Sequence, residues 1–146
     1  MTQVKIKKLN EKAIIPEYKT PGSAAIDLCA CLEETFTIEV GETALIPTGF
    51  AIQIEEDVTA LIFARSGLAS KNGISLANSV GVIDSDYRGE IKVAVVNRGK
   101  APYEINHGDR IAQMGFFPVL KAQFELADEL DSTERGEGGF GHTGIK

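Results

Sequence analysis

Cysteine and histidine are scarce in this chain of 146 residues, which contains two of each. The cysteines, Cys29 and Cys31, are separated by one residue, and a disulfide between positions this close is strained. A metal site built on them would need further ligands, and His107 and His142 are the only imidazoles that the sequence offers. We therefore expect two reduced thiols in or near the core.

Long apolar runs are also missing, so the sequence predicts no membrane span and no membrane partner. The N-terminal stretch MTQVKIKKLN carries lysines but no apolar core after them, and it is therefore not a signal peptide. This absence predicts a cytoplasmic protein, or one that acts in the host cytoplasm if its source is a virus or phage.

Basic clusters are limited to KIKK, and the formal net charge is −6. This balance argues against non-specific binding to duplex nucleic acid. An acidic protein can still bind phosphates through a few placed arginines, backbone N–H groups and a divalent cation.

Most of what is present reads as short strands. Hydrophobic residues make up 43% of the chain and charged residues 25%, values typical of one globular domain. The strand-like segments are VKIKKL (4–9), TFTIEV (35–40), ALIPTGFAIQI (44–54), VTALIFA (58–64), VGVID (80–84), EIKVAVVN (90–97) and RIAQMGFFPV (110–119). Their spacing and Gly/Pro punctuation predict an all-β sandwich or barrel. One short helix is predicted at SGLASKNG (66–73), with Ser66 as N-cap and Gly73 as terminator.

The composition changes after Leu126, where the chain becomes acidic and then rich in glycine. Such a segment cannot form a core of its own. We therefore predict a core domain of residues 1–127 and a C-terminal arm of residues 128–146 that is mobile when no ligand is bound.

The arm contains RGEGGFGHTG (135–144), which holds five of the fifteen glycines. Its match to G-x-G-x-x-G is accidental, because no strand precedes it and no helix follows it. Arg135 can clamp a phosphate, Phe140 can stack on a base, and Thr143 offers a hydroxyl. The alternative is an inert tail.

NSVGVIDSDYRGEIKV (78–93) places DSDYRG between two apolar-rich strands, a pattern that predicts a hairpin turn. The carboxylates of Asp84 and Asp86 either form the turn or act as a general base toward water. Gly81 and Gly89 would let a ligand approach the backbone closely.

Three further segments carry polar side chains at marked positions. ARSGLA (64–69) places Arg65, Ser66 and Gly67 at a strand-to-helix turn, where they bind an anion or simply cap the helix. PGSAAIDL (21–28) sets Asp27, and RIAQM (110–114) sets Arg110 and Gln113, in otherwise apolar runs. Taken singly, Asp27, Arg110 and Gln113 read as satisfied buried polar groups.

In this order the five segments PGSAAIDL, ARSGLA, GVIDSDYRGEIKV, RIAQM and RGEGGFGHTG resemble the five motifs of the trimeric deoxyuridine triphosphatases (dUTPases). The resemblance extends from Pro21 to Gly144. The first motif more commonly has Tyr or Leu among its small residues, but Asp27 is kept. The resemblance implies a single-domain, jelly-roll-like β-barrel that forms homotrimers with active sites between subunits. It also implies Mg²⁺-dependent hydrolysis of dUTP to dUMP and pyrophosphate by attack of water on the α-phosphorus. The reaction keeps dUTP low and supplies dUMP for thymidylate synthesis.

The resemblance also implies roles for individual residues. Asp84 is the general base, and Tyr87 packs on the deoxyribose and leaves no room for a 2′-hydroxyl. Asn78, the backbone of Val82, Ile83 and Asp84, and the backbone of Lys92 read uracil. The phosphates are held by Arg65, Ser66, Gly67 and Gln113, and Asp27 contacts the metal through water. The arm contributes Arg135, Phe140, Gly141 and Thr143.

Two alternatives remain open at this point. The related dCTP deaminases share the fold, but their catalytic glutamate lies five residues beyond the glycine that matches Gly89. That position is Ala94 here. A non-enzymatic β-sandwich that binds a nucleotide would not need Asp84 together with a complete arm.

Overall fold

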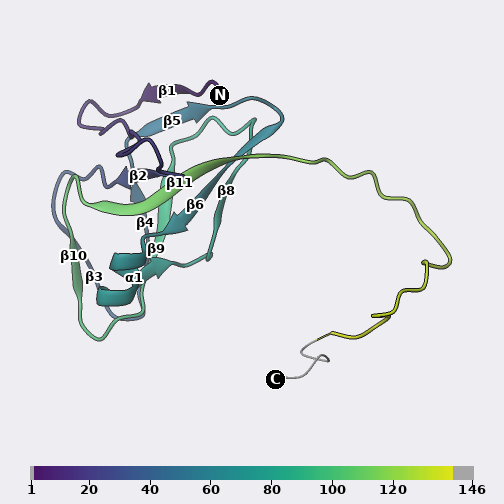
Figure 1. The fold of residues 1–146 in the computed structure, drawn as a ribbon. Helices are drawn as coiled ribbons and strands as arrows, with labels where there is room; N and C mark the ends of the chain where they lie inside the picture. Colours follow the sequence, from purple (N-terminus) through teal and green to yellow (C-terminus); the bar gives the residue numbers. More distant parts are fainter. Residues whose placement is uncertain (1, 140–146) are drawn as a thin grey trace.

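The computed structural model describes residues 2–139 and is almost entirely β-structure (Figure 1). The strands are β1 Lys5–Lys8, β2 Ile26–Cys29, β3 Phe36–Ile38, β4 Thr43–Pro47, β5 Phe50–Gln53, β6 Val58–Ala64, β7 Ile74–Leu76, β8 Gly81–Ile83, β9 Lys92–Asn97, β10 Tyr103–Ile105 and β11 Arg110–Pro118. Within the described range the one helix is α1 Ser66–Asn72. The prediction of an all-β chain with one short helix is confirmed.

The strands are arranged in two main sheets and two small pairs. The larger sheet has the order β2-β11-β6-β8, the second has the order β4-β9-β7, and β1-β5 and β3-β10 form the pairs. All of the pairings are antiparallel. Figure 1 shows these sheets wrapped around one interior.

The core follows from the alternation of side chains along the strands. In β9 the side chains of Val93 and Val95 are buried, whereas their neighbours Lys92 and Ala94 face outward. Phe50 lies at the centre and is fully buried. This apolar interior holds the strand ends, and therefore the functional side chains, in place.

Helix α1 differs from its prediction at one end. Arg65 is the N-cap, with extended backbone (φ −79°, ψ 124°) and no side-chain capping bond, so the assignment of Ser66 as N-cap is wrong. β6 runs to Ala64 and leaves Arg65 as the single residue between strand and helix. The prediction for the other end is confirmed, because Gly73 ends the helix in the left-handed conformation (φ 72°).

The predicted hairpin around DSDYRG is also wrong. β8 pairs with β6, whereas β9 lies between β4 and β7 in the other sheet. Residues 84–91 therefore connect two sheets. Turn residues mark a change of chain direction, but they do not determine which strands pair.

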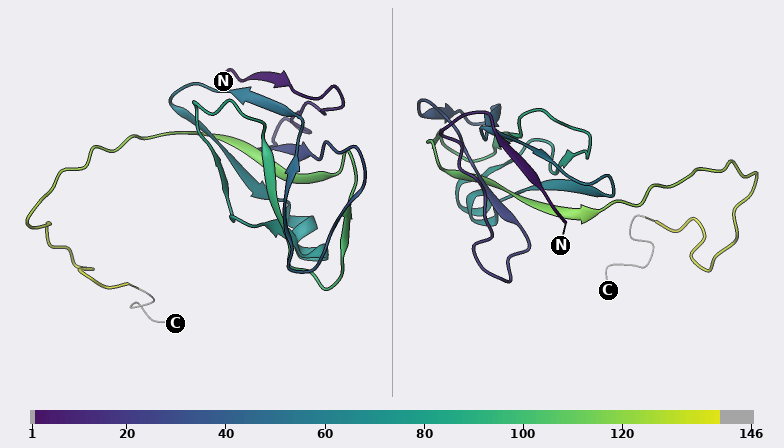
Figure 2. Two further views of the ribbon diagram at one scale, coloured as in Figure 1. Left: turned by 180° about the vertical axis from the view of Figure 1, so that it is seen from behind. Right: turned by 90° about the horizontal axis from the view of Figure 1, so that it is seen from above.

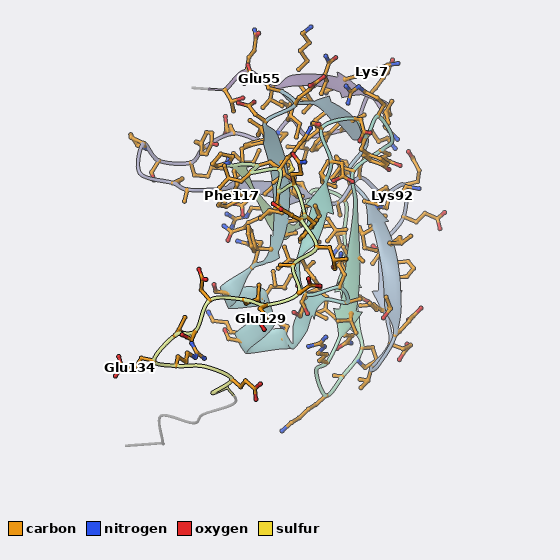
Figure 3. The ribbon with its side chains drawn as sticks, turned by 90° about the vertical axis from the view of Figure 1, so that its right-hand side faces the viewer. Lys7, Glu55, Lys92, Phe117, Glu129 and Glu134 are labelled. Atoms are coloured by element: carbon orange, nitrogen blue, oxygen red, sulfur yellow. The ribbon has the colours of Figure 1, made fainter. Side chains whose placement is uncertain are left out.

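Beyond β11, the backbone N–H of Val119 donates to the carbonyl of Asp57 at 2.8 Å. Residues 120–139 contain no helix or strand, and both views in Figure 2 show this segment extending away from the sheets. Glu134, on its outer part, lies clear of the strands (Figure 3). The extended segment thus begins before residue 128, where the composition predicts the arm. The mobility of that arm stays a prediction.

The fold also bears on the predictions about the cysteines and about membrane spans. Both cysteines are free thiols, with Cys31 buried and Cys29 half-buried, as expected. Among residues 2–139, no helix has the length and apolar character needed to cross a membrane.

Candidate active site

One cluster of polar side chains is centred on Asp27, on the sheet β2-β11-β6. Its carboxylate accepts hydrogen bonds from Arg65 Nε at 3.2 Å, Arg110 Nη1 at 3.2 Å and Gln113 Nε2 at 3.4 Å. The Asp27 side chain is only 11% exposed. Burial of this kind is tolerated because donors satisfy both carboxylate oxygens.

Strand register explains how residues far apart in sequence meet in this cluster. Gln113 on β11 lies directly opposite Asp27 on β2 and, on its other side, opposite Phe63 on β6. Arg65 follows two residues after Phe63 and therefore projects from the same face. Its guanidinium also donates to the carbonyl of Arg110 at 3.0 Å through Nη1.

The charges of this cluster favour an anion. Two guanidinium groups surround one carboxylate, which leaves a net positive charge beside the exposed residues Ser66 and Gly67. The pKa of the neighbouring Cys29 thiol is raised. Burial is the main cause, and the negative charge of Asp27 is the second.

A second group of predicted residues lies around β8. This strand is the last of its sheet in the described part of the chain, so one edge of its backbone faces no strand there. Val82 is 61% exposed, and Thr59 Oγ1 donates to the carbonyl of Ile83 at 3.0 Å. An exposed strand edge offers N–H and C=O groups that can pair with a base.

The turn before β8 is tight and brings Asn78 to the same place. Ser79 adopts a positive φ of 63°, and Val80 N–H donates to the carbonyl of Asn78 at 2.7 Å. A Cβ added to Gly81 would lie 3.6 Å from the Asn78 amide nitrogen and 3.2 Å from the Cβ of Ile62. The predicted uracil-reading residues Asn78, Val82 and Ile83 are therefore neighbours.

The segment after β8 carries Asp84 and Tyr87. Tyr87 N–H donates to the carbonyl of Asp84 at 3.1 Å, and Arg88 Nη1 donates to the carbonyls of Ser85 and Tyr87. Asp84 and Asp86 line a polar cleft of about 850 Å³. Lys5, Arg88 and Lys121 contribute cations to this cleft, and Glu55 and Glu56 contribute further carboxylates.

The chain does not bring Asp84 and Arg65 together. Ile83 pairs with Ala60, near one end of β6, whereas Arg65 follows its other end. Arg65 lies five positions beyond Ala60 along extended chain, which corresponds to about 17 Å. Asp84 lies one residue further away, so the two side chains of one subunit cannot act on the same phosphate group.

The residues predicted from the arm are only partly described. Arg135 is exposed, and its Nε donates to the carbonyl of Gly138 at 2.8 Å. Phe140, Gly141 and Thr143 lie outside the described residues. The backbone of Lys92, the remaining predicted contact to uracil, begins β9 opposite Pro47. Figure 3 labels the Lys92 side chain, which extends outward from its strand.

The sequence predicts that Asp27 contacts Mg²⁺ through water. Among residues 2–139, no three His, Cys, Asp or Glu side chains gather in a group that would hold a metal ion. Mg²⁺ does not require such a group when substrate phosphates and water supply most of its oxygens. Because the oxygens of Asp27 already accept three hydrogen bonds, the cluster fits contact through water better than direct ligation.

Comparison with known proteins identifies the family of this chain. The dUTPase family model matches residues 11–144. The chain belongs to the dUTPase family. It is 59% identical over 132 residues to a deoxyuridine 5′-triphosphate nucleotidohydrolase of Desulfitobacterium hafniense, a match covering 90% of this chain and 87% of the relative. A protein of the same name from Shewanella baltica is 54% identical over 133 residues, covering 90% and 88%.

Solved structures agree with this assignment. The dUTPase of Staphylococcus bacteriophage 80alpha, solved with dUpNHpp, has a TM-score of 0.90 at 27% identity, covering 98% of this chain and 99% of that chain. A dUTPase variant from phage phi11 of S. aureus, described with a structural Mg(II) ion, has a TM-score of 0.79 at 25% identity, covering 87% and 97%. The prediction of a jelly-roll-like β fold is therefore confirmed.

Sequence reasoning gave no role to some residues that the structure places at these clusters. Arg110 was noticed only as a polar residue in an apolar strand, yet it shares Asp27 with Arg65. Thr59 was not noticed, although it holds the carbonyl next to Asp84. Strand register carries both relationships, and no local pattern in the sequence reveals it.

Proposed function

We propose that this protein hydrolyses dUTP to dUMP and pyrophosphate, which keeps dUTP low and supplies dUMP for thymidylate synthesis. The observation that carries the proposal is the 59% identity, over 90% of the chain, to a deoxyuridine triphosphate nucleotidohydrolase. We also propose that it acts in the cytoplasm, where its deoxynucleotide substrate would be encountered.

The base would be read at the exposed edge of β8. Asn78, the backbone of Val82 and Ile83, and the backbone of Lys92 would pair with the O4 and N3–H of uracil. Cytosine presents the opposite donor and acceptor pattern, so its binding would leave buried groups unpaired. A site built on hydrogen bonds rejects such an analogue by about 10⁴–10⁵. The close packing around Gly81 would exclude the methyl group of thymine.

The phosphates would lie at the Asp27 cluster. Arg65 and Gln113 would bind them, together with Ser66 and Gly67 at the exposed start of α1. Asp27 would hold the Arg65 guanidinium and the Gln113 amide in position before the substrate arrives. Preorganised donors stabilise the charge that develops in the transition state without reorganisation during the reaction.

Asp84 would accept a proton from the attacking water. The carboxylate is exposed at the cleft, so water can reach it. Removing a proton from water as it attacks the α-phosphorus requires a base within hydrogen-bond reach. Mg²⁺ held by the triphosphate would reduce its negative charge, with Asp27 contacting the ion through water.

We further propose a homotrimer with active sites between subunits. The distance of about 17 Å along β6 separates the phosphate-binding and base-reading residues of one chain, so one site would combine Arg65 from one copy with Asp84 from another. The segment after β11 supports assembly, because Leu120, Phe124 and Leu126 are each at least 95% exposed. Apolar side chains exposed together in this way mark a contact surface.

The arm would close the site over the nucleotide. Arg135 would meet the phosphates, Phe140 would stack on uracil, and Gly141 and Thr143 would contact the substrate. Closure would exclude bulk water and strengthen the charge interactions at the α-phosphorus.

Hydrolysis of a nucleotide panel tests this function. dUTP should be cleaved, whereas dCTP and dTTP should not, and the products should be dUMP and pyrophosphate. In H₂¹⁸O the label should enter dUMP. Label in pyrophosphate would overturn attack at the α-phosphorus. Release of ammonia from dCTP would favour the deaminase alternative, and nucleotide binding without turnover would favour the regulatory one.

A further inference from the structure

The ring of Tyr87 rests on a residue that has no side chain. A Cβ added to Gly89 would lie 2.4 Å from the Tyr87 hydroxyl oxygen, 2.6 Å from Cζ and 3.0 Å from Cε2. The Tyr87 hydroxyl donates to the carbonyl of Glu90 at 3.0 Å. Tyr87 as a whole nevertheless remains 44% exposed. One side of the ring is therefore supported by the chain, while the remaining surface is free for a ligand.

The support beneath Tyr87 is itself fixed to a neighbouring turn. Glu90 Oε1 accepts a hydrogen bond from Gly49 N–H at 2.9 Å, and the Glu90 side chain is only 24% exposed. Thr48 Oγ1 donates to the carbonyl of Ile91 at 2.7 Å. Residues 90 and 91 are thus held to the turn between β4 and β5. The Tyr87 hydroxyl is therefore hydrogen-bonded to the carbonyl of a residue, Glu90, that is itself held in place.

We propose that Gly89 and Glu90 are positioning residues for selection of deoxyribose over ribose. This rests on the proposed packing of Tyr87 on the sugar. Rejection of a 2′-hydroxyl by a ring is steric, so it depends on where the ring lies. A displacement of about 1 Å at a reacting or recognition site can cost about 100-fold in rate. Gly89 allows the ring to lie close to the backbone, and Glu90 holds that backbone in place.

The measurement is the ratio of kcat/KM for dUTP to kcat/KM for UTP. The fraction of active protein cancels in this ratio, so partial misfolding of a variant does not change it. The unaltered protein should have a high ratio, and Tyr87→Ala should lose most of it. Gly89→Ala and Glu90→Ala should each lower the ratio by about 10-fold or more. Glu90→Gln should retain it, because the amide oxygen still accepts from Gly49 N–H.

Two controls separate positioning from a general structural effect. Glu42 Oε2 accepts from Glu39 N–H at 2.8 Å in another turn, so Glu42→Ala removes a similar bond and should leave the ratio unchanged. In a Tyr87→Ala background, Gly89→Ala has no ring to displace and should lower the ratio no further.

The outcomes distinguish the role of Tyr87 from the roles of Gly89 and Glu90. Equal hydrolysis of dUTP and UTP by the unaltered protein would overturn the role of Tyr87 and, with it, the roles of its supports. If Tyr87→Ala loses selectivity but Gly89→Ala and Glu90→Ala keep it, only the positioning proposal is overturned. It is also overturned if Gly89→Ala has the same effect with and without the Tyr87 ring.

Discussion

Replacing Asp27 with asparagine tests whether this carboxylate holds the phosphate-binding side chains. The substitution keeps the shape of the side chain but removes its charge. It also places an NH₂ group where one oxygen accepts a hydrogen bond, so one guanidinium would face a donor. Arg65 would lose its ion pair at 3.2 Å, and so would Arg110.

The magnitude follows from the exposure of the two partners. Arg65 is 26% exposed and Asp27 is 11% exposed, and a hydrogen bond to a charged group in such a setting contributes about 1.5–3 kcal/mol. Arg110 is 51% exposed, so its pair adds about 0–1 kcal/mol. Together the two pairs contribute about 1.5–4 kcal/mol. If all of it is lost from the transition state, kcat/KM for dUTP should fall by about 10- to 1,000-fold.

The assay measures kcat/KM for dUTP over a series of Mg²⁺ concentrations. If Asp27 acts mainly on Arg65 and Gln113, the defect should persist at saturating Mg²⁺. Glu17→Gln is the matched control, because its pair with Lys19 at 2.7 Å is exposed on both sides and contributes little. Full recovery of Asp27→Asn at high Mg²⁺ would refute the anchoring role and assign the residue to the metal.

Four other results are expected. Asp84→Asn should reduce turnover by about 10²–10⁴ with dUTP binding nearly intact, whereas Asp86→Asn, in the same cleft, should stay active in a steady-state assay; the reverse result would make Asp86 the base. Deletion of residues 132–146 should abolish most activity with little change in Tm, and mixing that variant with Asp84→Asn should restore part of it by subunit exchange. No recovery after verified exchange would refute an arm acting between subunits. Gly73→Ala should lower the unfolding free energy by about 1–3 kcal/mol, measured by chemical denaturation, because its positive φ and a backbone nitrogen 2.4 Å from the added Cβ oppose the side chain; unchanged stability would refute that strain. Alkylation of Cys29 should require more alkaline pH than alkylation of a free cysteine, because its raised pKa leaves less thiolate at a given pH; equal pH profiles would contradict this.

Local patterns in the sequence predicted eight of the eleven strands among the described residues, but they did not predict β2, β7 or β10. Short apolar runs between turn residues, in VTALIFA and EIKVAVVN, were enough to identify β6 and β9. Gly73 predicted the end of α1 because a left-handed residue is needed there. Each of these signals depends only on neighbours in the chain.

The pairing of strands could not be predicted from such local patterns. DSDYRG has the composition of a hairpin turn, yet β8 and β9 lie in different sheets, since their pairing is decided by which edges are free and which faces are buried. The support of Tyr87 by Gly89 was missed for a similar reason. Gly89 was expected to admit a ligand, but the structure shows that it admits a side chain of its own segment.

The register of β6 also explains why the order of the motifs along the chain does not reveal how far apart Arg65 and Asp84 lie. Arg65 and Asp84 are nineteen residues apart in sequence, and no local pattern indicates how far apart they lie in the folded chain. Antiparallel pairing of β6 with β8 instead carries Asp84 back to the opposite end of β6. A strand of seven residues is rigid at this scale, so the backbone positions of Arg65 and Asp84 in one subunit stay about 17 Å or more apart along the sheet. If Arg65 and Asp84 act on the same phosphate group, as we propose, a second copy of the chain supplies one of them, and we expect activity to be lost on dilution into monomers.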